Sequence, residues 1–157
     1  MSKYKPMPSH FSGSRAEMRT LDTFIKLTRC VNSVGTRLAE RNTTGELSAS
    51  QFAVLEALYH LGSLTQGEVS AKLLKSGSNI TTVIDNLERD GLVMRERDEK
   101  DRRVIHIHLT EAGKSRLEAV LPGHIGALVD LFSVLTEEEQ ETLASLCKKL
   151  GKGKVAK

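Results

Sequence analysis

The sequence predicts a mainly α-helical domain that carries one β-hairpin, and three observations indicate this fold class. The chain has 157 residues, 39% hydrophobic and 27% charged, which is the composition of a single globular domain. It contains four Ser/Thr-x-x-Glu/Gln boxes, and in each box the two side chains satisfy free backbone donors at a helix start. Residues 92–109 instead alternate apolar and polar side chains, as paired strands do.

Helical periodicity follows the boxes. A long first helix is expected over about residues 14–41, because apolar side chains recur through it at spacings of three and four. Two shorter helices follow, one with Phe52 and Leu55 on its apolar face and one with Val69 and Leu73. The four boxes are Ser14/Glu17, Ser48/Gln51, Thr65/Glu68 and Thr136/Glu139.

A fourth helix and a hairpin come next. Gly91 suits the left-handed position that ends a helix. Two strands are expected over residues 92–97 and 103–109, joined by a wholly charged tip at residues 98–102. The apolar face of the fourth helix consists of four side chains at helical spacing, which are Ile80, Val83, Ile84 and Leu87.

Two further helices complete the predicted set. One begins at Thr110 and is expected to kink at Pro122, because proline lacks the N–H of a helical hydrogen bond. The other carries Leu143, Leu146 and Leu150 on one face. The apolar stripes of the first, fifth and sixth helices exceed what one small lobe can cover, so we expect them to pack against a second copy of the chain.

The order of short helices, polar helix and charged hairpin is that of a winged helix-turn-helix, whose second helix enters the DNA major groove while the hairpin, or wing, reaches the flanking backbone or minor groove. The predicted fold class is therefore mainly α, a winged helix-turn-helix with N- and C-terminal dimerisation helices. The expected parts are a flexible arm (1–13), an N-terminal dimerisation helix and linker (14–47), a winged helix-turn-helix DNA-binding lobe (48–110), C-terminal dimerisation helices (111–150) and a basic tail (151–157).

Several protein classes do not fit the sequence. Cys30 and Cys147 form no C-x-x-C pair, which argues against a structural zinc site and a secreted disulfide framework. No apolar run approaches the ~20 residues that span a bilayer and no signal peptide is visible, so we expect a cytoplasmic protein without a membrane partner. The chain lacks a glycine-rich phosphate loop, a G-x-S-x-G elbow and an H-E-x-x-H pair, so we expect neither an enzyme nor a cofactor.

The fourth helix has short hydroxyl and amide side chains where a solvated helix usually has lysine and glutamate. Such side chains allow close approach to base edges, and asparagine suits adenine while threonine methyl groups suit thymine. The alternative is an ordinary polar helix face. Asp85, on the same side, repels phosphates unless it accepts from cytosine or pairs with a nearby cation. The base contacts that we expect come from Ser78, Asn79, Thr81, Thr82 and Asn86.

The wing contains the run Gly91-Leu92-Val93-x-Arg95, followed by Asp101-x-Arg103 and Leu109-Thr110-x-x-Gly113. With the preceding helices, this run resembles the MarR family of bacterial transcription regulators over about residues 20–150. The resemblance implies a homodimer held by the first, fifth and sixth helices. It also implies two winged lobes on a pseudo-palindromic, double-stranded operator, which is released by a small molecule or by oxidation.

The resemblance further implies that Arg103 enters the minor groove and that Asp101 orients it. A guanidinium also suits the negative potential of a narrow minor groove on physical grounds. Phosphate contacts are expected from Lys75, Arg95, Arg97 and Arg102. The alternative is that these four side chains belong to an ordinary solvated surface. Residues 65–109 carry eight basic and eight acidic side chains, so this segment has no net positive charge.

The sequence gives the least information about the signal that releases the DNA. The resemblance implies a pocket between the dimerisation helices and the winged lobe, for a small phenolic or quinone ligand. Phe24, Asn32, Tyr59 and His60 are its candidate lining, with ordinary core use as the alternative. On release, backbone adjustment is expected where the junctions carry a glycine, Gly45 and Gly113.

Two other chemistries are disfavoured. His106 and His108 share a strand face, but no third ligand lies near them in the sequence, so no metal site is expected. Cys30 lies well inside the first helix and Cys147 on the apolar stripe of the sixth, which favours packing in the interior over redox sensing.

These observations together predict a homodimeric DNA-binding transcription regulator, most simply a repressor released by a small aromatic ligand. Two alternatives stay open. One is a thiol-based redox-sensing regulator, and the other is a winged-helix module that binds protein and not DNA.

Overall fold

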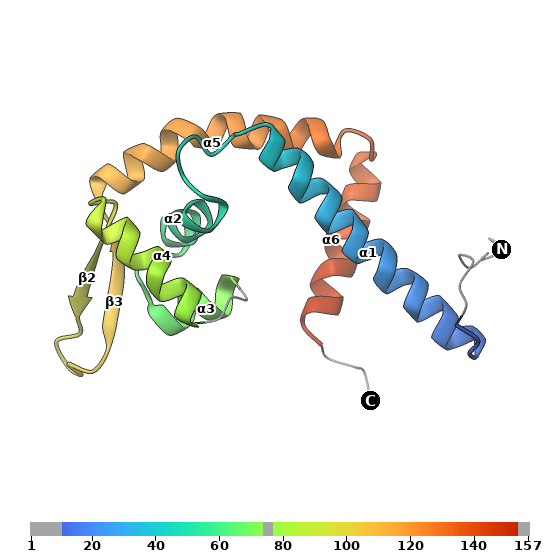
Figure 1. Ribbon diagram of the computed structural model, residues 1–157, viewed down its shortest axis with the longest axis horizontal. Coiled ribbons are helices and arrows are strands. Elements are labelled where there is room, and N and C mark those ends of the chain that lie inside the picture. Colours follow the sequence, from blue (N-terminus) through green and yellow to red (C-terminus); the bar gives the residue numbers. More distant parts are fainter. Residues whose placement is uncertain (1–10, 74–76, 154–157) are drawn as a thin grey trace. The chain divides into compact units, whose positions relative to one another are not determined.

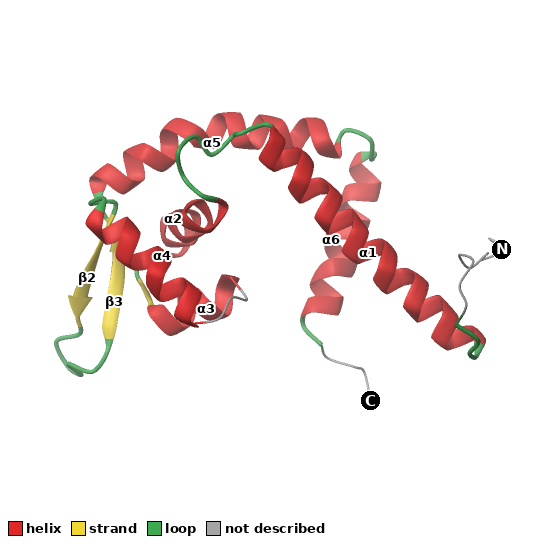
Figure 2. Ribbon diagram, in the orientation of Figure 1, coloured by secondary structure: helices red, strands yellow, loops and turns green. Residues whose placement is uncertain are grey.

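The computed structural model describes residues 11–73 and 77–153, apart from the side chains of Gly77 and Ser78. These ranges form helices and three short strands, so the mainly α fold with one hairpin is confirmed (Figure 1, Figure 2). In chain order the elements are α1 (Arg15–Glu40), α2 (Ala49–Leu61), β1 (Leu64–Thr65), α3 (Gln66–Leu73), α4 (Gly77–Arg89), β2 (Val93–Arg97), β3 (Ile105–Leu109), α5 (Glu111–Phe132) and α6 (Glu137–Gly151).

The chain divides into two compact units between Arg41 and Asn42. In the first unit, α1 begins with the predicted capping box, because Ser14 Oγ accepts the Glu17 N–H at 3.3 Å and the Glu17 carboxylate accepts the Ser14 N–H at 2.8 Å. The long first helix is thereby confirmed. Its exposed side carries Phe24 and Val31.

The second unit contains a three-stranded antiparallel sheet in the order β1-β3-β2. β2 and β3 form the predicted hairpin, in which Arg95 lies opposite Ile107. β1 was not predicted and pairs Leu64 with Ile107 from the other side. Two residues are too few for an alternating pattern to show, and the sequence at Thr65 indicates only a helix start.

An aliphatic core holds α4 within this lobe. The predicted apolar face of α4 is confirmed, since Ile80, Ile84 and Leu87 are completely buried. Burying one such side chain contributes about 1.5–3 kcal/mol, so the cluster fixes the rotation of α4 about its axis. The other buried side chains of the cluster come from the 42–48 turn, α2, α3, the sheet and α5, and they are Leu47, Phe52, Val54, Leu55, Leu58, Leu64, Val69, Val93, Ile107 and Leu117.

The base of the wing is joined closely to α4 and α5. Gly91 takes the left-handed conformation (φ +71°) that ends α4, as predicted. The Thr110 N–H donates to the Leu92 carbonyl at 3.1 Å, and Thr110 Oγ1 donates to the Gly91 carbonyl at 2.8 Å. Gly113 packs on the same Leu92 carbonyl, where a Cβ would lie 2.0 Å from the oxygen.

The two glycines of the predicted hinges therefore have different roles. Gly45 has a φ of +62° in the turn before α2, a conformation that favours glycine. Gly113 is buried inside α5, and its missing side chain is needed for close approach and not for unusual backbone angles. The junction at Gly113 is a packed joint.

α5 and α6 follow the lobe. α5 continues through Pro122 as one helix, so the proline does not divide it. α6 begins at the predicted Thr136 box and buries none of its side chains. Leu146 and Leu150 are 59% and 66% exposed on α6.

Length and apolar composition decide whether a helix of the described ranges can cross a bilayer. No single helix there is both long and apolar enough to cross a bilayer, and α5 and α6 satisfy length and composition only as a pair bent by 103°.

Candidate nucleic-acid interface

α4 presents a polar side away from the core. Its buried residues set the rotation of the helix, so positions about 180° away face outward. Asn79, Thr82 and Asp85 are exposed there, and Asn86 is half-buried at the edge. Of the predicted base contacts on this helix whose side chains the structure describes, Asn79 and Thr82 are exposed.

Thr81 has a contact within the lobe. It is half-buried, and its hydroxyl accepts a hydrogen bond from Gln66 Nε2 of α3 at 2.5 Å. This bond crosses from the first to the second helix of the helix-turn-helix. Two further predicted contacts, Lys75 and the side chain of Ser78, lie outside the described residues.

One carboxylate closes the tip of the wing. Asp98 Oδ1 accepts the backbone N–H groups of Lys100 at 2.8 Å and of Asp101 at 2.9 Å. The Asp98 N–H donates to the Val104 carbonyl at 3.0 Å, and the Val104 N–H donates to the Asp101 carbonyl at 2.8 Å. The N–H donors of Asp101 and Lys100 lower the pKa of Asp98, because they favour its charged form. An ionised Asp98 thus favours the hydrogen bonds that close the tip.

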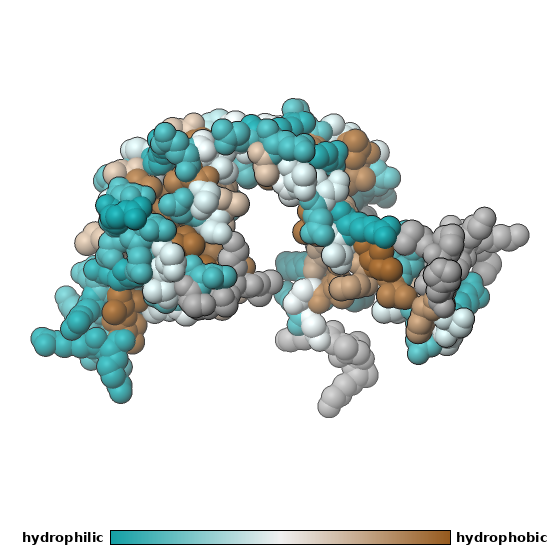
Figure 3. Space-filling view, in the orientation of Figure 1, coloured by the Kyte–Doolittle hydropathy of each residue, from teal (hydrophilic) through white to brown (hydrophobic). Residues whose placement is uncertain are grey.

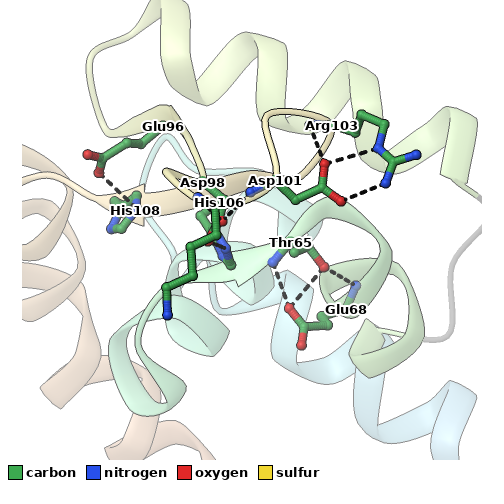
Figure 4. A network of polar contacts seen from close by, with 9 residues as sticks. Thr65, Glu68, Glu96, Asp98, Asp101, Arg103, His106 and His108 are labelled. Carbon is green, nitrogen blue, oxygen red and sulfur yellow. Dashed lines mark hydrogen bonds and ion pairs between the residues drawn. The ribbon is translucent and has the colours of Figure 1, made fainter.

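Arg103 is held at this tip by Asp101 (Figure 4). Arg103 Nε donates to Oδ1 and Nη2 donates to Oδ2, both at 3.0 Å, and the Arg103 backbone N–H donates to Oδ1 at 3.1 Å. This fork from Arg103 lowers the pKa of Asp101. The Arg103 side chain is nevertheless 90% exposed, so Asp101 orients a guanidinium that stays open to solvent.

Arg97 and Arg102 are also exposed on the hairpin. The space-filling view shows a hydrophilic surface over the hairpin tip (Figure 3). The tip therefore offers cationic groups to a partner without any need to break apolar contacts.

Arg95 has a different environment, because its side chain is only 25% exposed and lies between β2 and α4. Nη2 donates to Asp85 Oδ1 at 2.5 Å, Nη1 donates to Glu88 Oε2, and the backbone N–H donates to Glu88 Oε1 at 3.2 Å. Burial opposes the charged form, but the hydrogen bonds to the two carboxylates outweigh it and raise the pKa of Arg95. Asp85 thus has a nearby cation, whereas a phosphate contact by Arg95 would require these bonds to break.

The outer face of the sheet holds the two predicted histidines (Figure 4). His106 Nε2 lies 3.5 Å from Asp98 Oδ2, and His108 Nε2 lies 3.2 Å from Glu96 Oε2. These four side chains border an open cleft of about 230 Å³. Within residues 11–73 and 77–153, no group of three or more His, Cys, Asp or Glu side chains is arranged to hold a metal ion.

A second open cleft, of about 500 Å³, lies between α2 and the start of α5, and Tyr59 lines it. The Tyr59 hydroxyl donates to the Glu118 carboxylate at 3.0 Å, and this bond raises the pKa of Tyr59. His60 is exposed, with its ring 5.2 Å from that of Tyr59 and edge-on to it. The other candidate pocket residues, Phe24 and Asn32, are exposed on α1, which belongs to the other unit.

Both cysteines are exposed in the single chain, Cys30 on α1 and Cys147 on α6. The expectation that they pack in the interior is therefore wrong for the single chain. The reason on α6 is that the apolar stripe carrying Cys147 is itself left open, since this helix buries no side chain.

Three residues of the interface were not predicted from the sequence, and they are Gln66, Glu88 and Asp98. Asp98 did have a local signal, because an aspartate that begins a turn commonly accepts the N–H groups that follow it. Gln66 and Glu88 had none, since their partners lie 15 and 7 residues away in other elements.

Comparison with known proteins gives a consistent result. Residues 47–105 match the model of the MarR family. The uncharacterized HTH-type transcriptional regulator YkoM of Bacillus subtilis is 35% identical over 133 residues, covering 85% of this chain and 86% of that protein. The transcriptional repressor MprA of Escherichia coli is 33% identical over 132 residues, covering 80% of this chain and 75% of that protein.

A solved structure agrees with these relatives. The PcaV transcriptional regulator of Streptomyces coelicolor, in complex with its natural ligand, has a TM-score of 0.71 and 25% identity, covering 80% of this chain and 89% of that one. The relatives are transcription regulators and not enzymes, as the sequence predicted for this chain.

Proposed function

The chain belongs to the MarR family, and we propose that this DNA-binding transcription regulator acts as a homodimeric repressor of a pseudo-palindromic operator, released by a small aromatic ligand. The observation that carries the DNA-binding proposal is Arg103, which is 90% exposed yet fixed by a two-bond contact with Asp101 at the end of the wing. An oriented and exposed guanidinium suits the narrow minor groove beside a recognition helix.

α4 is the proposed recognition helix. Its apolar face is buried, which leaves the side with Asn79 and Thr82 to enter the major groove. Asn86 and Thr81, both half-buried beside that side, and Ser78, near the start of the helix sequence, are the further proposed base contacts. Arg97 and Arg102 are the proposed phosphate contacts, and these set register without reading sequence.

The proposed homodimer rests on apolar side chains that the single chain leaves open. Ile125 and Val129 of α5 are 49% and 63% exposed, Leu146 and Leu150 of α6 are similarly open, and Val31 of α1 is 61% exposed. Leaving this much apolar surface in water is unfavourable, and a second copy is the partner that a two-fold operator requires. Two lobes would then bind half-sites about one helical turn apart, roughly 10 base pairs.

Substitution on the open faces tests the dimer. Leu146→Glu with Leu150→Glu should convert dimers into monomers in sedimentation velocity, because charges would be buried in the interface. Leu61→Glu is the matched control, since Leu61 is also an exposed leucine but lies on α2. Dimers that persist in the doubly substituted protein would contradict the proposed interface.

Two of the similar proteins, and one cleft of this chain, support repression and release by a ligand. MprA is a transcriptional repressor, and PcaV has been solved with its natural ligand. In this chain the cleft offers the ring and hydroxyl of Tyr59 and the carboxylate of Glu111 at the start of α5. Such a ligand releases DNA only if it binds the DNA-incompetent arrangement more tightly than the competent one.

A thiol signal is the second candidate, and the exposure of Cys30 favours it, whereas Cys147 lies on the α6 stripe that the proposed dimer would cover. Exposed thiols are accessible to oxidants, whereas buried ones are generally inert. Release of DNA by an oxidant or by a phenol distinguishes the thiol signal from the aromatic ligand. If an oxidant releases DNA from the wild type but not from Cys30→Ser or Cys147→Ser, and no phenol has an effect, the regulator senses thiol oxidation.

The main experiment measures binding of the full chain to the DNA upstream of its own gene by fluorescence anisotropy, with and without a panel of phenols and quinones. We expect salt-sensitive specific binding, release by at least one aromatic compound, and a rise in thermal stability with that compound. Absence of any preference over unrelated DNA of equal length would contradict the DNA-binding proposal.

A further inference from the structure

Arg95 is the one predicted phosphate contact whose guanidinium is largely enclosed. It is 25% exposed, against 90% for Arg103 on the same hairpin. Both of its outer nitrogens are engaged, Nη2 with Asp85 at 2.5 Å and Nη1 with Glu88. A third bond, from its backbone N–H to Glu88 Oε1 at 3.2 Å, ties the strand itself to the same carboxylate.

These bonds join the two elements of the lobe that the proposed function assigns to DNA. Asp85 and Glu88 lie on α4, and Arg95 lies in the middle of β2. The turn between them, at Gly91, uses a left-handed glycine, a residue that also permits other conformations. A guanidinium that bridges two carboxylates across that turn restricts the angle between helix and wing more than the turn alone does.

The bonds also change the charge that α4 presents. Asp85 is on the exposed side of the helix, between the proposed contacts Thr82 and Asn86. A lone carboxylate there would repel DNA phosphates, and a guanidinium at 2.5 Å offsets that charge.

We propose that Arg95 is a positioning residue, which holds α4 and the wing in one fixed arrangement and neutralises Asp85, and that it contacts no phosphate. The three residues Asp85, Glu88 and Arg95 form what we call the helix–wing clamp. This inference rests on the proposed function, because it assigns a role within DNA binding.

Salt dependence separates the clamp from a phosphate contact. Each phosphate contact contributes about 0.9 to the slope of log affinity against log salt, so removal of one lowers the slope by about that amount. Anisotropy is measured for wild type and Arg95→Met at several KCl concentrations, on upstream DNA and on unrelated DNA. Arg103→Ala and Arg97→Met serve as comparisons, and Arg97 lies on the same strand face two residues further on.

For Arg95→Met we expect an unchanged salt slope and a ratio of specific to unspecific affinity that falls about tenfold or more, because α4 no longer meets the base edges correctly. A slope lower by about 0.9 with an unchanged ratio would overturn the proposal, since that is the result for a phosphate contact.

A double-mutant cycle tests directly whether Arg95 acts by neutralising the charge of Asp85. If Arg95 acts through Asp85, then Arg95→Met should cost much less affinity in an Asp85→Asn chain than in the wild type. Equal fold-losses in the two backgrounds would overturn the proposal, because independent contacts add.

Two further controls separate the clamp from a folding defect and from the proposed DNA-binding function. If thermal melting shows that Arg95→Met is unfolded, Arg95→Lys replaces it, since lysine keeps the charge but cannot reach Asp85 and Glu88 with two separate nitrogens. We expect Arg95→Lys to lose specificity at an unchanged slope, and wild-type specificity in this variant would overturn the clamp. If the wild type itself shows no preference for the upstream DNA, the proposed function fails and the clamp fails with it. If Arg95→Met instead lowers the salt slope and leaves the affinity ratio unchanged, the clamp fails but the proposed function stands.

Discussion

The tip and the base of the wing each contain an arginine bound to carboxylate, yet the two arginines are used differently. At the tip, Arg103 pairs with Asp101 two residues before it and stays 90% exposed. At the base, Arg95 reaches back 7 and 10 residues to Glu88 and Asp85 and is 25% exposed. A pair made within one turn presents its cation to a partner, whereas a pair made between elements uses the cation to hold those elements together.

The same contrast holds for the backbone. The tip is closed by hydrogen bonds to one half-exposed loop carboxylate, Asp98. The base is closed by tightly packed contacts, where Leu92 meets Thr110 and the buried Gly113 without room for a methyl group at Gly113. Substitutions at the base should therefore change stability, and substitutions at the tip should change DNA binding with little effect on stability.

The largest effect is expected at Gly113. Gly113→Ala would place a Cβ 2.0 Å from the Leu92 carbonyl oxygen and 2.9 Å from Leu109 Cδ1, so the wing must move away from α5. We expect the free energy of unfolding to fall by about 3 kcal/mol, measured by urea denaturation. Gly123→Ala is the control in the same helix, because nothing lies within 4 Å of that position, and it should be neutral or stabilising by up to about 1 kcal/mol. Equal midpoints for the two variants would show that the base is not tightly packed.

The next effect is on DNA affinity and concerns the tip. Arg103→Ala should weaken operator binding by about 1–3 kcal/mol, because a charged minor-groove contact is lost. Its free energy of unfolding should stay close to the wild-type value, since the pair with Asp101 is exposed. Anisotropy and urea denaturation measure the two quantities. Wild-type affinity in Arg103→Ala at several salt concentrations would remove the wing from the proposed interface.

A smaller effect on stability is expected from Arg95→Met. This change leaves Asp85 and Glu88 without their cation in a partly enclosed site, and we expect a loss of about 1–2 kcal/mol in the free energy of unfolding. The urea denaturation of Arg95→Met is compared with that of Arg103→Ala under the same conditions. If the two variants unfold at the same urea concentration, the distinction between base and tip does not hold.

The smallest effect is the pH response of the tip. The pKa of Asp98 is lowered by the N–H groups of Asp101 and Lys100, so its contribution to order is present above the unfolded carboxyl pKa of about 3.9 and is lost as the pH falls through the lower folded value. We expect the amide NMR signals of Lys100 and Asp101 to shift with a midpoint below about 3.9. In Asp98→Asn, which keeps an acceptor oxygen but does not titrate, this shift should vanish. A midpoint at or above the unfolded value would mean that the loop bonds do not favour the ionised carboxylate.

The contrast between tip and base also explains which features the sequence could predict. Capping boxes, the apolar face of α4 and the alternation of the hairpin are local patterns, and each leads to an element that the structure contains. The association of Asp101 with Arg103 is local as well, and the same residues carry the family resemblance. Local patterns in this chain therefore identify both the fold and the exposed end of the interface.

The features that were missed depend on packing between elements. β1 has two residues, and its strand character comes only from its pairing with β3. Gln66 meets Thr81 and Arg95 meets Asp85 because the core fixes α3, α4 and β2 side by side. Gly113 was predicted as a hinge, since the sequence shows a glycine but not the carbonyl against which it packs.

In the proposed complex, the wing tip lies in the minor groove while α4 lies in the major groove of the same half-site. Directed cleavage tests it most directly, with an iron chelate attached to a single cysteine in a chain carrying Cys30→Ser and Cys147→Ser. From Lys100→Cys at the tip, we predict cuts across the minor groove at the two outer flanks of the operator, and from Thr82→Cys on α4, cuts inside each half-site. Cleavage spread evenly along the duplex, or the same cuts from both positions, would contradict it.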